Sequence, residues 1–422
     1  MIVAGKRNPW PCFDLAIVSP SVKEVPYYRG TLPSAALGDT ISLDVFRMIP
    51  LTRPALLRER PFAFVAQDAK LSRIYFSGGT LGRPTMHPYT SEDWEAACER
   101  TARAFRYTGI KAGDSVAVLH PFDIWSIGPE FVQALAQLGA TVLPIGIHLS
   151  EETICGLLHR HPVTALCAAP GHLCRIVNAA AKTGHPLPPV QWIIVSGEPV
   201  TAAQRAYLHQ FLGGEVFSLY GCSELDTLAC ECAAHNGLHL IADDLYIEVL
   251  DPSSQQPVAE GETGEIVVTS QRTQAMPLVR FAIGDLVRLV AGGCLCGTDS
   301  PRIEILGRGE ERVPLGDGTD LSAFQISAVL EPFCDEILDW QVLLSGPPER
   351  VELQLLVAFN EAWSTDVLQA IESRIRKASV DLEDCLAASI IAVCRVSPAS
   401  LAELERTGRG KRKWLIDNRT KS

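Results

Sequence analysis

Residues 115–145 read SVAVLHPFDIWSIGPEFVQALAQLGATVLPI, and this stretch decides the fold. An apolar run at 115–119 fits a buried strand, a helical pattern follows at 128–138, and a second apolar run occupies 141–145. Because parallel strands need a crossover connection, which a helix usually supplies, this order predicts a parallel pair. The same alternation continues to residue 195. The sequence therefore predicts the α/β class, with helices layered on a largely parallel sheet.

The flanking segments complete the predicted domain organisation. Residues 25–67 are rich in proline and arginine and fit helices and turns, whereas short strands separated by turn residues follow Tyr246. A polar break at 307–311 precedes about a hundred residues with an α+β pattern. We predict an N-terminal domain, 1–308, of parallel-sheet α/β layers with a small β subdomain. We expect a small, mobile α+β lid domain at 309–422.

Composition excludes several classes of function. The 422 residues carry a formal net charge of −12, which argues against nucleic-acid binding because that binding needs a cationic face. No apolar run is long enough to cross a bilayer, and the first residues lack the order of a signal peptide. We expect a cytoplasmic protein without a membrane partner, in which the 13 cysteines form no disulfide framework.

A loop of glycines and hydroxyl residues lies between the apolar stretch 74–76 and a helix start at Thr90. It reads Ser77-Gly78-Gly79-Thr80-Leu81-Gly82-Arg83-Pro84-Thr85. Glycines permit positive φ and leave amide N–H groups free to donate, so an oligophosphate is the expected guest. The usual P-loop spacing is absent, however, and an ordinary glycine-rich turn explains the stretch about as well.

A second candidate segment reads Tyr220-Gly221-Cys222-Ser223-Glu224 and follows the strand-like stretch 216–219. In α/β sheets, ligand-binding loops follow the carboxyl ends of strands. A tyrosine in such a loop can stack on a base, and a carboxylate can hold a hard cation beside phosphates. By itself the segment is also compatible with an ordinary turn.

Taken in order, six segments resemble the adenylate-forming enzymes, and within them the phenylacetate–CoA ligase branch. The six are 77–85, Ser196-Gly197-Glu198-Pro199, 220–224, Met276 to Phe281 with Asp285, Gly307-Arg308-Gly309-Glu310, and Gly410-Lys411. The resemblance covers nearly the whole chain and implies the adenylate-forming enzyme fold. It also implies that a carboxylate attacks ATP to give an acyl-AMP and pyrophosphate, after which a thiol takes the acyl group. Catalysis would then rest on positioning and charge stabilisation.

The resemblance implies a role for each of these residues. The catalytic set would be Lys411 at the α-phosphate, Glu224 on Mg²⁺ and Arg308 assisting at the ribose, and Glu310 would be the hinge. Residues that would bind ATP or AMP are Ser77, Gly79, Thr80, Gly82 and Thr85 at the phosphates, Gly197, Glu198 and Pro199 beside the adenine, Tyr220 stacked on the adenine, Gly221 and Ser223 from the same segment, and Asp285 on the ribose hydroxyls. Each role has a rival as an ordinary capping or solvated residue, and Lys411 lies in a basic stretch, 406–413, that would usually be solvated.

Two close cysteine pairs supply a further candidate site. Cys232 stands seven positions before His239, and Cys294-x-Cys296 follows, which gives a Cys₃His set suited to tetrahedral zinc. Because all four positions would be filled, we expect a structural Zn²⁺ that clamps the β subdomain. Cys230 and His235 are competing ligands, and thiols without a metal are the alternative.

The resemblance further implies a pocket for an aryl or arylacetic acid. The candidate pocket residues are Phe122, Asp123, Trp125, Phe131 and His148, and the two polar ones, which could meet a substituent, could equally face solvent or cap helices. The turn at 315–320 departs from the family pattern, as do Leu81 and Arg83. The acceptor is therefore coenzyme A or, alternatively, the thiol of an acyl-carrier protein or an amine in secondary metabolism.

Two other classes of function stay open at this stage, a non-catalytic homologue that binds a nucleotide or acyl adenylate, and a zinc-dependent hydrolase. A homodimer is one assembly compatible with the sequence.

Overall fold

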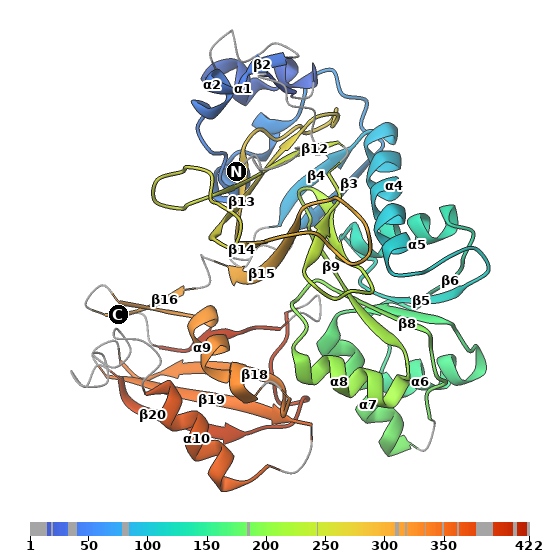
Figure 1. Ribbon diagram of the computed structural model, residues 1–422, viewed down its shortest axis with the longest axis vertical. Helices are drawn as coiled ribbons and strands as arrows, with labels where there is room; N and C mark the ends of the chain where they lie inside the picture. Colours follow the sequence, from blue (N-terminus) through green and yellow to red (C-terminus); the bar gives the residue numbers. More distant parts are fainter. Residues whose placement is uncertain are drawn as a thin grey trace. The chain divides into compact units, whose positions relative to one another are not determined.

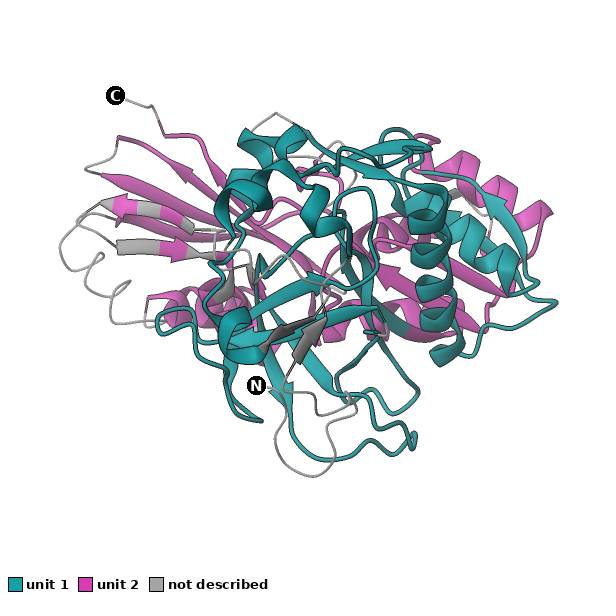
Figure 2. Ribbon diagram, turned by 90° about the horizontal axis from the view of Figure 1, so that it is seen from above, with its two compact units in different colours: residues 1–146, 217–306 teal, residues 147–216, 307–422 magenta. Residues whose placement is uncertain are grey.

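The computed structural model describes residues 15–17, 20–32, 40–77, 84–183, 186–242, 244–308, 312–316, 319–333, 335–347, 350–360, 363–376, 391–407 and 412–419. Its contacts divide the chain into two compact units, one formed by 1–146 with 217–306 and the other by 147–216 with 307–422 (Figure 2). This division interleaves the chain and differs from the predicted domain boundary after residue 308. That boundary stays a prediction.

The first unit contains a run of mostly antiparallel strands. In the order in which they neighbour one another, they are β12 (Leu245–Leu250), β13 (Thr263–Ser270), β14 (Phe281–Val290), β15 (Arg302–Arg308), β11 (Leu238–Leu240), β10 (Asp226–Glu231) and β9 (Glu215–Cys222) (Figure 1). The pairs β12–β13, β13–β14, β15–β11, β11–β10 and β10–β9 are antiparallel. The predicted β subdomain is thus present in this unit.

Short elements precede these strands in the chain. They are β1 (Leu15–Ile17), η1 (Pro20–Glu24), α1 (Pro26–Thr31), β2 (Thr40–Ser42), α2 (Leu43–Arg47), α3 (Pro54–Glu59) and η3 (Pro61–Phe64). The helices agree with the helices and turns predicted for 25–67, whereas strand β2 was not predicted, and buried residues of the helices share an apolar core with the strands. Proline stands at the start of α1 and α3, where its missing N–H is not needed. Buried Tyr28 and Phe46 join the apolar core formed with Leu278 and Phe281, and the Tyr28 hydroxyl accepts the N–H of Val279 at 2.9 Å.

The stretch 115–145 folds as predicted. Strands β5 (Ser115–Leu119) and β6 (Thr141–Pro144) pair in parallel, and α5 (Ile127–Gln137) connects them. Helix α4 (Ser91–Tyr107) packs on α5. Thr90 caps its N-terminus: the Thr90 hydroxyl accepts the Asp93 N–H, and the Asp93 carboxylate accepts the Thr90 N–H.

The second unit contains an α/β part and an α+β part. The first part comprises α6 (Glu151–Arg160), β7 (Ala165–Ala168), α7 (Pro170–Thr183), β8 (Trp192–Ser196) and α8 (Ala202–Leu212), and β7 and β8 are parallel. The second part comprises β16 (Arg312–Gly316), β17 (Thr319–Ser322), α9 (Ala323–Leu330), η4 (Glu331–Phe333), β18 (Ile337–Ser345), β19 (Val351–Phe359), α10 (Thr365–Ile375), β20 (Ile391–Pro398) and β21 (Leu415–Asp417).

Four of these strands form a mixed sheet in the order β20-β19-β18-β21, with α10 packed against β20 (Figure 1). Helices α7 and α8 also contact β18. The α+β prediction for the end of the chain is therefore confirmed.

Two local expectations are wrong. The glycine-rich loop does not lead from a strand into a helix, because β3 (Arg73–Ser77) and β4 (Thr85–Tyr89) pair antiparallel on either side of it. The half-buried Tyr75 and the buried Tyr89, one from each strand, both pack against the Trp94 ring, which favours the hairpin. Tyr220 and Gly221 lie within β9 rather than in a turn, since the strand continues to Cys222 along its pairing with β10. None of the helices in the described part of the chain has both the length and the apolar character needed to span a bilayer.

Candidate functional site

Two of the predicted nucleotide-binding residues meet in the first unit. The Tyr220 hydroxyl, on β9, donates to the Asp285 carboxylate, on β14, at 2.6 Å. Asp285 is buried, and Tyr220 is half-buried. Gly221, the next residue of β9, permits the close approach of β9 to β10, because a Cβ atom at this position would lie 2.2 Å from the carbonyl oxygen of Asp226. The fold thus brings together two residues that stand 65 positions apart in the sequence.

Glu224, the predicted magnesium ligand, borders a cavity of about 210 Å³ in the same unit. Its carboxylate lies 3.8 Å from Nε2 of the buried His87. Most of the charged groups that line the cavity are acidic; the lining includes Glu92, Asp93, Glu224, Asp226, Asp244, Arg100 and Arg272. A wall rich in carboxylates suits a hard cation. The magnesium role of Glu224 stays a prediction.

A buried arginine holds the turn that carries Glu224. Arg100, from α4, donates to the carbonyl oxygens of Leu225 and Thr227 at 2.9 Å each and to Asp244 at 2.5 Å. Asp226 adopts a left-handed conformation, with φ 58°, and accepts the hydroxyl proton of Tyr89 at 2.7 Å. Burial raises the pKa of Asp226 to about 6, although Arg100 and the Tyr89 hydrogen bond oppose this rise. Sequence reasoning missed this network, whose members belong to no motif.

Several predicted site residues lie at the edge of the described part of the chain or outside it. Ser77 and Thr85 are cross-strand partners at the end of the β3–β4 hairpin, and Thr85 is buried. Arg308 is the last residue of β15. Gly79, Thr80, Gly82, Glu310 and Lys411 lie outside the described residues. The roles of all these residues stay predictions.

The carboxylate of Glu198 is occupied by groups of its own unit. It accepts the N–H of Gly171 at 3.1 Å and the N–H of Arg412 at 2.7 Å, and it forms an ion pair with Arg406 at 3.2 Å. Burial alone would raise its pKa, but Arg412, Arg406 and the two amide donors hold the pKa below its ordinary value. Gly197, with φ 87°, turns the chain before it. The rival interpretation of 406–413 as a solvated basic stretch is wrong for Arg412, which is buried, and for Arg406, whose side chain is 11% exposed.

The candidate substrate residues differ in exposure. Phe131 is buried, and its ring packs edge-on against Phe105 and His120 at 5.1 Å each. The Phe122 ring closes over the helix start at Gly128, where a Cβ atom would meet it at 3.0 Å. The remaining three are Trp125, which is half-buried, and Asp123 and His148, which are exposed. Their assignment to a substrate pocket stays a prediction.

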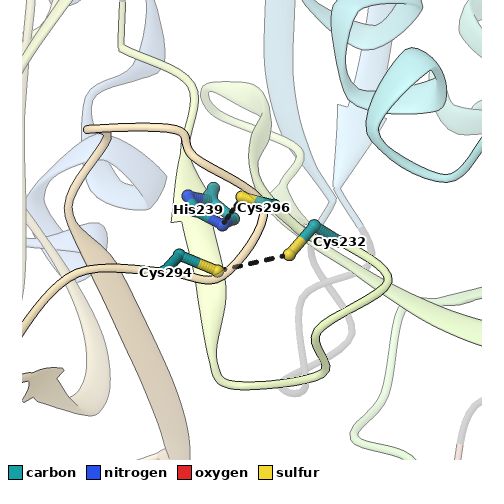
Figure 3. A group of neighbouring side chains, drawn as sticks. All are labelled: Cys232, His239, Cys294 and Cys296. Carbon is teal, nitrogen blue, oxygen red and sulfur yellow. Dashed lines mark hydrogen bonds between the residues drawn. The ribbon is translucent and has the colours of Figure 1, made fainter.

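The predicted metal ligands converge in the first unit. Cys232, His239, Cys294 and Cys296 offer ligand atoms that all lie within 4.8 Å of one another (Figure 3). The Cys232 and Cys294 sulfurs are 3.6 Å apart, and the Cys296 sulfur lies 3.4 Å from Nε2 of His239. Three thiols and one imidazole at this spacing are the donor set of a closed tetrahedral zinc site.

Two neighbouring side chains support this cluster. The buried Arg302 donates to the carbonyl oxygen of Asn236 at 2.6 Å and to that of Gly292 at 2.7 Å, so it joins the two loops that carry the cysteines. The Tyr107 ring stacks on His239 with ring centroids 5.5 Å apart. Neither contact could be read from the ligand spacing alone.

The competing ligands are not members of the described cluster. His235 faces Glu231 at 3.5 Å and packs against the Phe217 ring, and Cys230 is buried within β10. The geometry therefore favours the predicted set of four.

Comparisons with known proteins agree with this architecture. The family model described as AMP-binding enzyme matches residues 66–276. The chain is 27% identical over 363 residues to the phenylacetate-coenzyme A ligase of Thermus thermophilus, with 83% of this chain and 81% of the relative covered. It is 29% identical over 279 residues to the phenylacetate-coenzyme A ligase of Aromatoleum evansii, with 64% of this chain and 63% of the relative covered. The alignment thus spans less than two thirds of the second relative.

A solved structure shows the same fold. The 2-hydroxyisobutyryl-CoA ligase, in its postadenylation state with 2-HIB-AMP, matches with a TM-score of 0.76 and 21% identity, over 94% of this chain and 86% of that chain. The predicted adenylate-forming fold is thereby confirmed.

Proposed function

Since the chain belongs to the AMP-binding enzyme family, in its phenylacetate–CoA ligase-like branch, and is an acid–thiol ligase that acts through an acyl-AMP, we propose that its substrate is an aromatic carboxylic acid and its acceptor coenzyme A. The two relatives described above are named for phenylacetate, an arylacetic acid. Benzoates and arylacetates are the acids to be tested.

The hydrogen bond between Tyr220 and Asp285 carries the nucleotide half of this proposal. Asp285 can receive the two ribose hydroxyls on its acceptor oxygens, and the Tyr220 hydroxyl orients that carboxylate while its ring offers a face to the adenine. Glu224 supplies a carboxylate for the Mg²⁺ that neutralises phosphate charge when bound. Lys411 stabilises negative charge as the substrate carboxylate attacks the α-phosphate.

The test is ATP–pyrophosphate exchange with a panel of benzoates, arylacetates and short aliphatic acids. We expect exchange with at least one aromatic acid and a large loss in Asp285→Asn. Glu304→Gln is a matched control, because Glu304 is a half-exposed acid on β15 that forms an ion pair with the half-exposed Arg288. Exchange with aliphatic acids alone would contradict the aromatic assignment.

The acceptor is tested separately, by supplying coenzyme A, a carrier-protein thiol or an amine after adenylation. We expect the coenzyme A thioester. Transfer to the carrier protein or the amine, with none to coenzyme A, would contradict this part of the proposal and favour an enzyme of secondary metabolism.

We also propose that Cys232, His239, Cys294 and Cys296 hold a structural zinc ion. Four protein ligands complete a tetrahedron and leave no position for a substrate, so the ion would fasten the two loops of the β subdomain. Metal analysis of the purified protein should find about one zinc per chain. Cys232→Ser should lower both the zinc content and the melting temperature, whereas Cys167→Ser, at a buried cysteine of the second unit, should leave the zinc content unchanged. Equal zinc content in wild type and Cys232→Ser would refute the site.

A further inference from the structure

Four charged side chains form a closed, buried cluster within the second unit. Glu198 follows β8, Asp339 lies in β18, and Arg406 and Arg412 stand in the chain segment before β21. Their side chains are 3%, 0%, 11% and 1% exposed, in that order. Two carboxylates and two guanidinium groups give the cluster no net charge. Burial of so many charges is costly and is offset here by ion pairs between the carboxylates and the guanidinium groups. The guanidinium nitrogens of Arg412 are buried without a hydrogen-bond partner among the described residues, so its ion pair with Asp339 is not supported by a hydrogen bond.

Each carboxylate bridges both arginines. Asp339 pairs with Arg406 through one oxygen and with Nε of Arg412, at 2.5 Å, through the other. Glu198 pairs with the Arg406 guanidinium at 3.2 Å and accepts the Arg412 backbone N–H at 2.7 Å. Its other amide donor is Gly171, one of the first residues of α7, where the helix terminus favours negative charge. Glu198 therefore ties the start of α7 to both ends of the segment 406–412.

The base of this segment is closed by further contacts. Arg406 and Arg412 form an isolated antiparallel bridge. The Gln341 side-chain amide donates to the carbonyl oxygens of Glu405 and Lys413, at 3.1 and 2.6 Å, which joins the residues just outside the bridge. The Arg412 guanidinium also lies over the Trp414 ring, 4.0 Å from its centroid. The two ends of the segment are thus fixed to each other and to β18.

We infer that Glu198 and Asp339 are positioning residues: they hold Arg406 and Arg412, the described residues on either side of Lys411 in the chain, and the rate at which Lys411 acts depends on that hold. The inference rests on the proposed function, in which Lys411 acts at the α-phosphate. It gives Glu198 a different role from the one expected of it, the wall of an adenine pocket. Small displacements of a catalytic group cost much of its effect, so loosening this base should lower the rate of adenylation rather than the affinity for ATP.

The first experiment compares Glu198→Gln with Glu405→Gln. Both changes remove one carboxylate next to the same segment, but Glu405 is exposed, and its described ion pair is with Lys413 at the surface. For Glu198→Gln we expect the kcat of ATP–pyrophosphate exchange to fall by about tenfold or more, with the KM for ATP changed by no more than about twofold. Thioester formation from supplied acyl-AMP should stay within about twofold of wild type, as should every rate of Glu405→Gln.

A change in the KM for ATP without a change in kcat would overturn the inference. If Glu198 contacts the adenine, Glu198→Gln raises the KM for ATP and leaves kcat near the wild-type value. An unchanged kcat with an unchanged KM would overturn it equally.

A second experiment has a readout that needs no turnover. Amide hydrogen exchange of the peptide that contains Arg412 should speed up by about tenfold in Glu198→Gln, while peptides from β19 exchange as in wild type. Should Glu198→Gln not fold, Gly171→Ala replaces it, because its new methyl group would lie 2.5 Å from the Arg406 guanidinium and displace it without removing a charge. Unchanged Arg412 exchange in the folded variant overturns the inference. If the wild-type protein adenylates no acid, the proposed function is refuted instead. Amide hydrogen exchange of the Arg412 peptide still tests whether Glu198 holds this part of the chain.

Discussion

Raising the pH should destabilise the first unit through one buried carboxyl group. Glu130 lies on α5, 3% exposed, and its Oε1 accepts the hydroxyl protons of Thr101 and, at 3.2 Å, of Thr227. Burial raises its pKa from 4.5 to about 8, and the negative charge of Asp226 adds to this rise, against the two hydroxyl donors and Arg100. We therefore expect the Glu130 carboxyl group to keep its proton to a higher pH in the folded protein than in the unfolded chain.

The sign of the effect follows from proton linkage. Between pH 4.5 and 8 the folded state holds a proton on Glu130 that the unfolded chain releases. The contribution of this group to stability is thus complete below the unfolded pKa and is lost as the pH rises through the folded pKa. At about 1.4 kcal/mol for each unit of pKa difference, the loss between pH 5 and pH 8.5 comes to about 4 kcal/mol.

The measurement is urea unfolding of wild type, Glu130→Gln and Glu99→Gln at pH 5, 7 and 8.5. Glutamine retains an oxygen acceptor for the two threonine hydroxyls but has no proton to lose. The free energy of unfolding of Glu130→Gln should therefore rise relative to that of wild type by about 4 kcal/mol over this pH range. Glu99, exposed on α4, is the matched control, and its variant should follow the wild-type pH profile.

Parallel pH profiles for wild type and Glu130→Gln would refute the reasoning, because the folded protein would then hold Glu130 ionised. A wild-type stability that increases from pH 5 to 8.5, together with the same increase in Glu130→Gln, would have the same meaning.

Three further perturbations test the supports of the candidate site. Arg100→Met should lower the free energy of unfolding by about 3–5 kcal/mol, measured by urea denaturation, because it leaves the buried Asp226 and the partly buried Asp244 without their cation. Tyr220→Phe removes the 2.6 Å hydrogen bond to Asp285, and steady-state kinetics should show the KM for ATP rising about tenfold while the melting temperature changes little. Gly128→Ala places a methyl group 2.4 Å from a backbone carbonyl oxygen at the start of α5, and should cost about 1–3 kcal/mol in the same denaturation assay.

Periodicity was sufficient to predict the regular elements of this fold. Helix α4 starts directly after the predicted Thr90, and α5 lies within one residue of the predicted 128–138, because apolar residues recur at helical spacing in both. The β3–β4 hairpin was missed. Its second strand is five residues long and fully buried, so it shows no alternation of polar and apolar residues. Strand β9 was predicted too short for a related reason, since the glycine at 221 suggested a turn and instead permits the close approach of β10.

The candidate site was predictable only where its chemistry needs rare residue types. Cysteine and histidine at zinc-ligand spacing are uncommon by chance, so the set of 232, 239, 294 and 296 could be chosen before its side chains were seen to converge. Tyr220 and Asp285 were chosen from the order of motifs, although nothing in the sequence pairs the two. Arg302, which joins the two cysteine-bearing loops, has no local signal, because its function is to donate to backbone carbonyl groups that any sequence provides.

The buried charges were beyond sequence reasoning for a physical reason that also bears on their function. Arginine and glutamate are usually surface residues, so the sequence predicts that arginines at 406 and 412 are solvated. Only the fold places carboxylates beside them. An apolar contact could close the base of the 406–412 segment at a lower desolvation cost. An apolar contact, however, tolerates sliding, whereas the hydrogen-bonded ion pairs of Arg406 and the Arg412 backbone N–H bound to Glu198 fix both distance and direction. If Lys411 has the proposed role, the residues beside it need a fixed direction more than they need stability, and the cost of burying Glu198 and Asp339 is consistent with a positioning role.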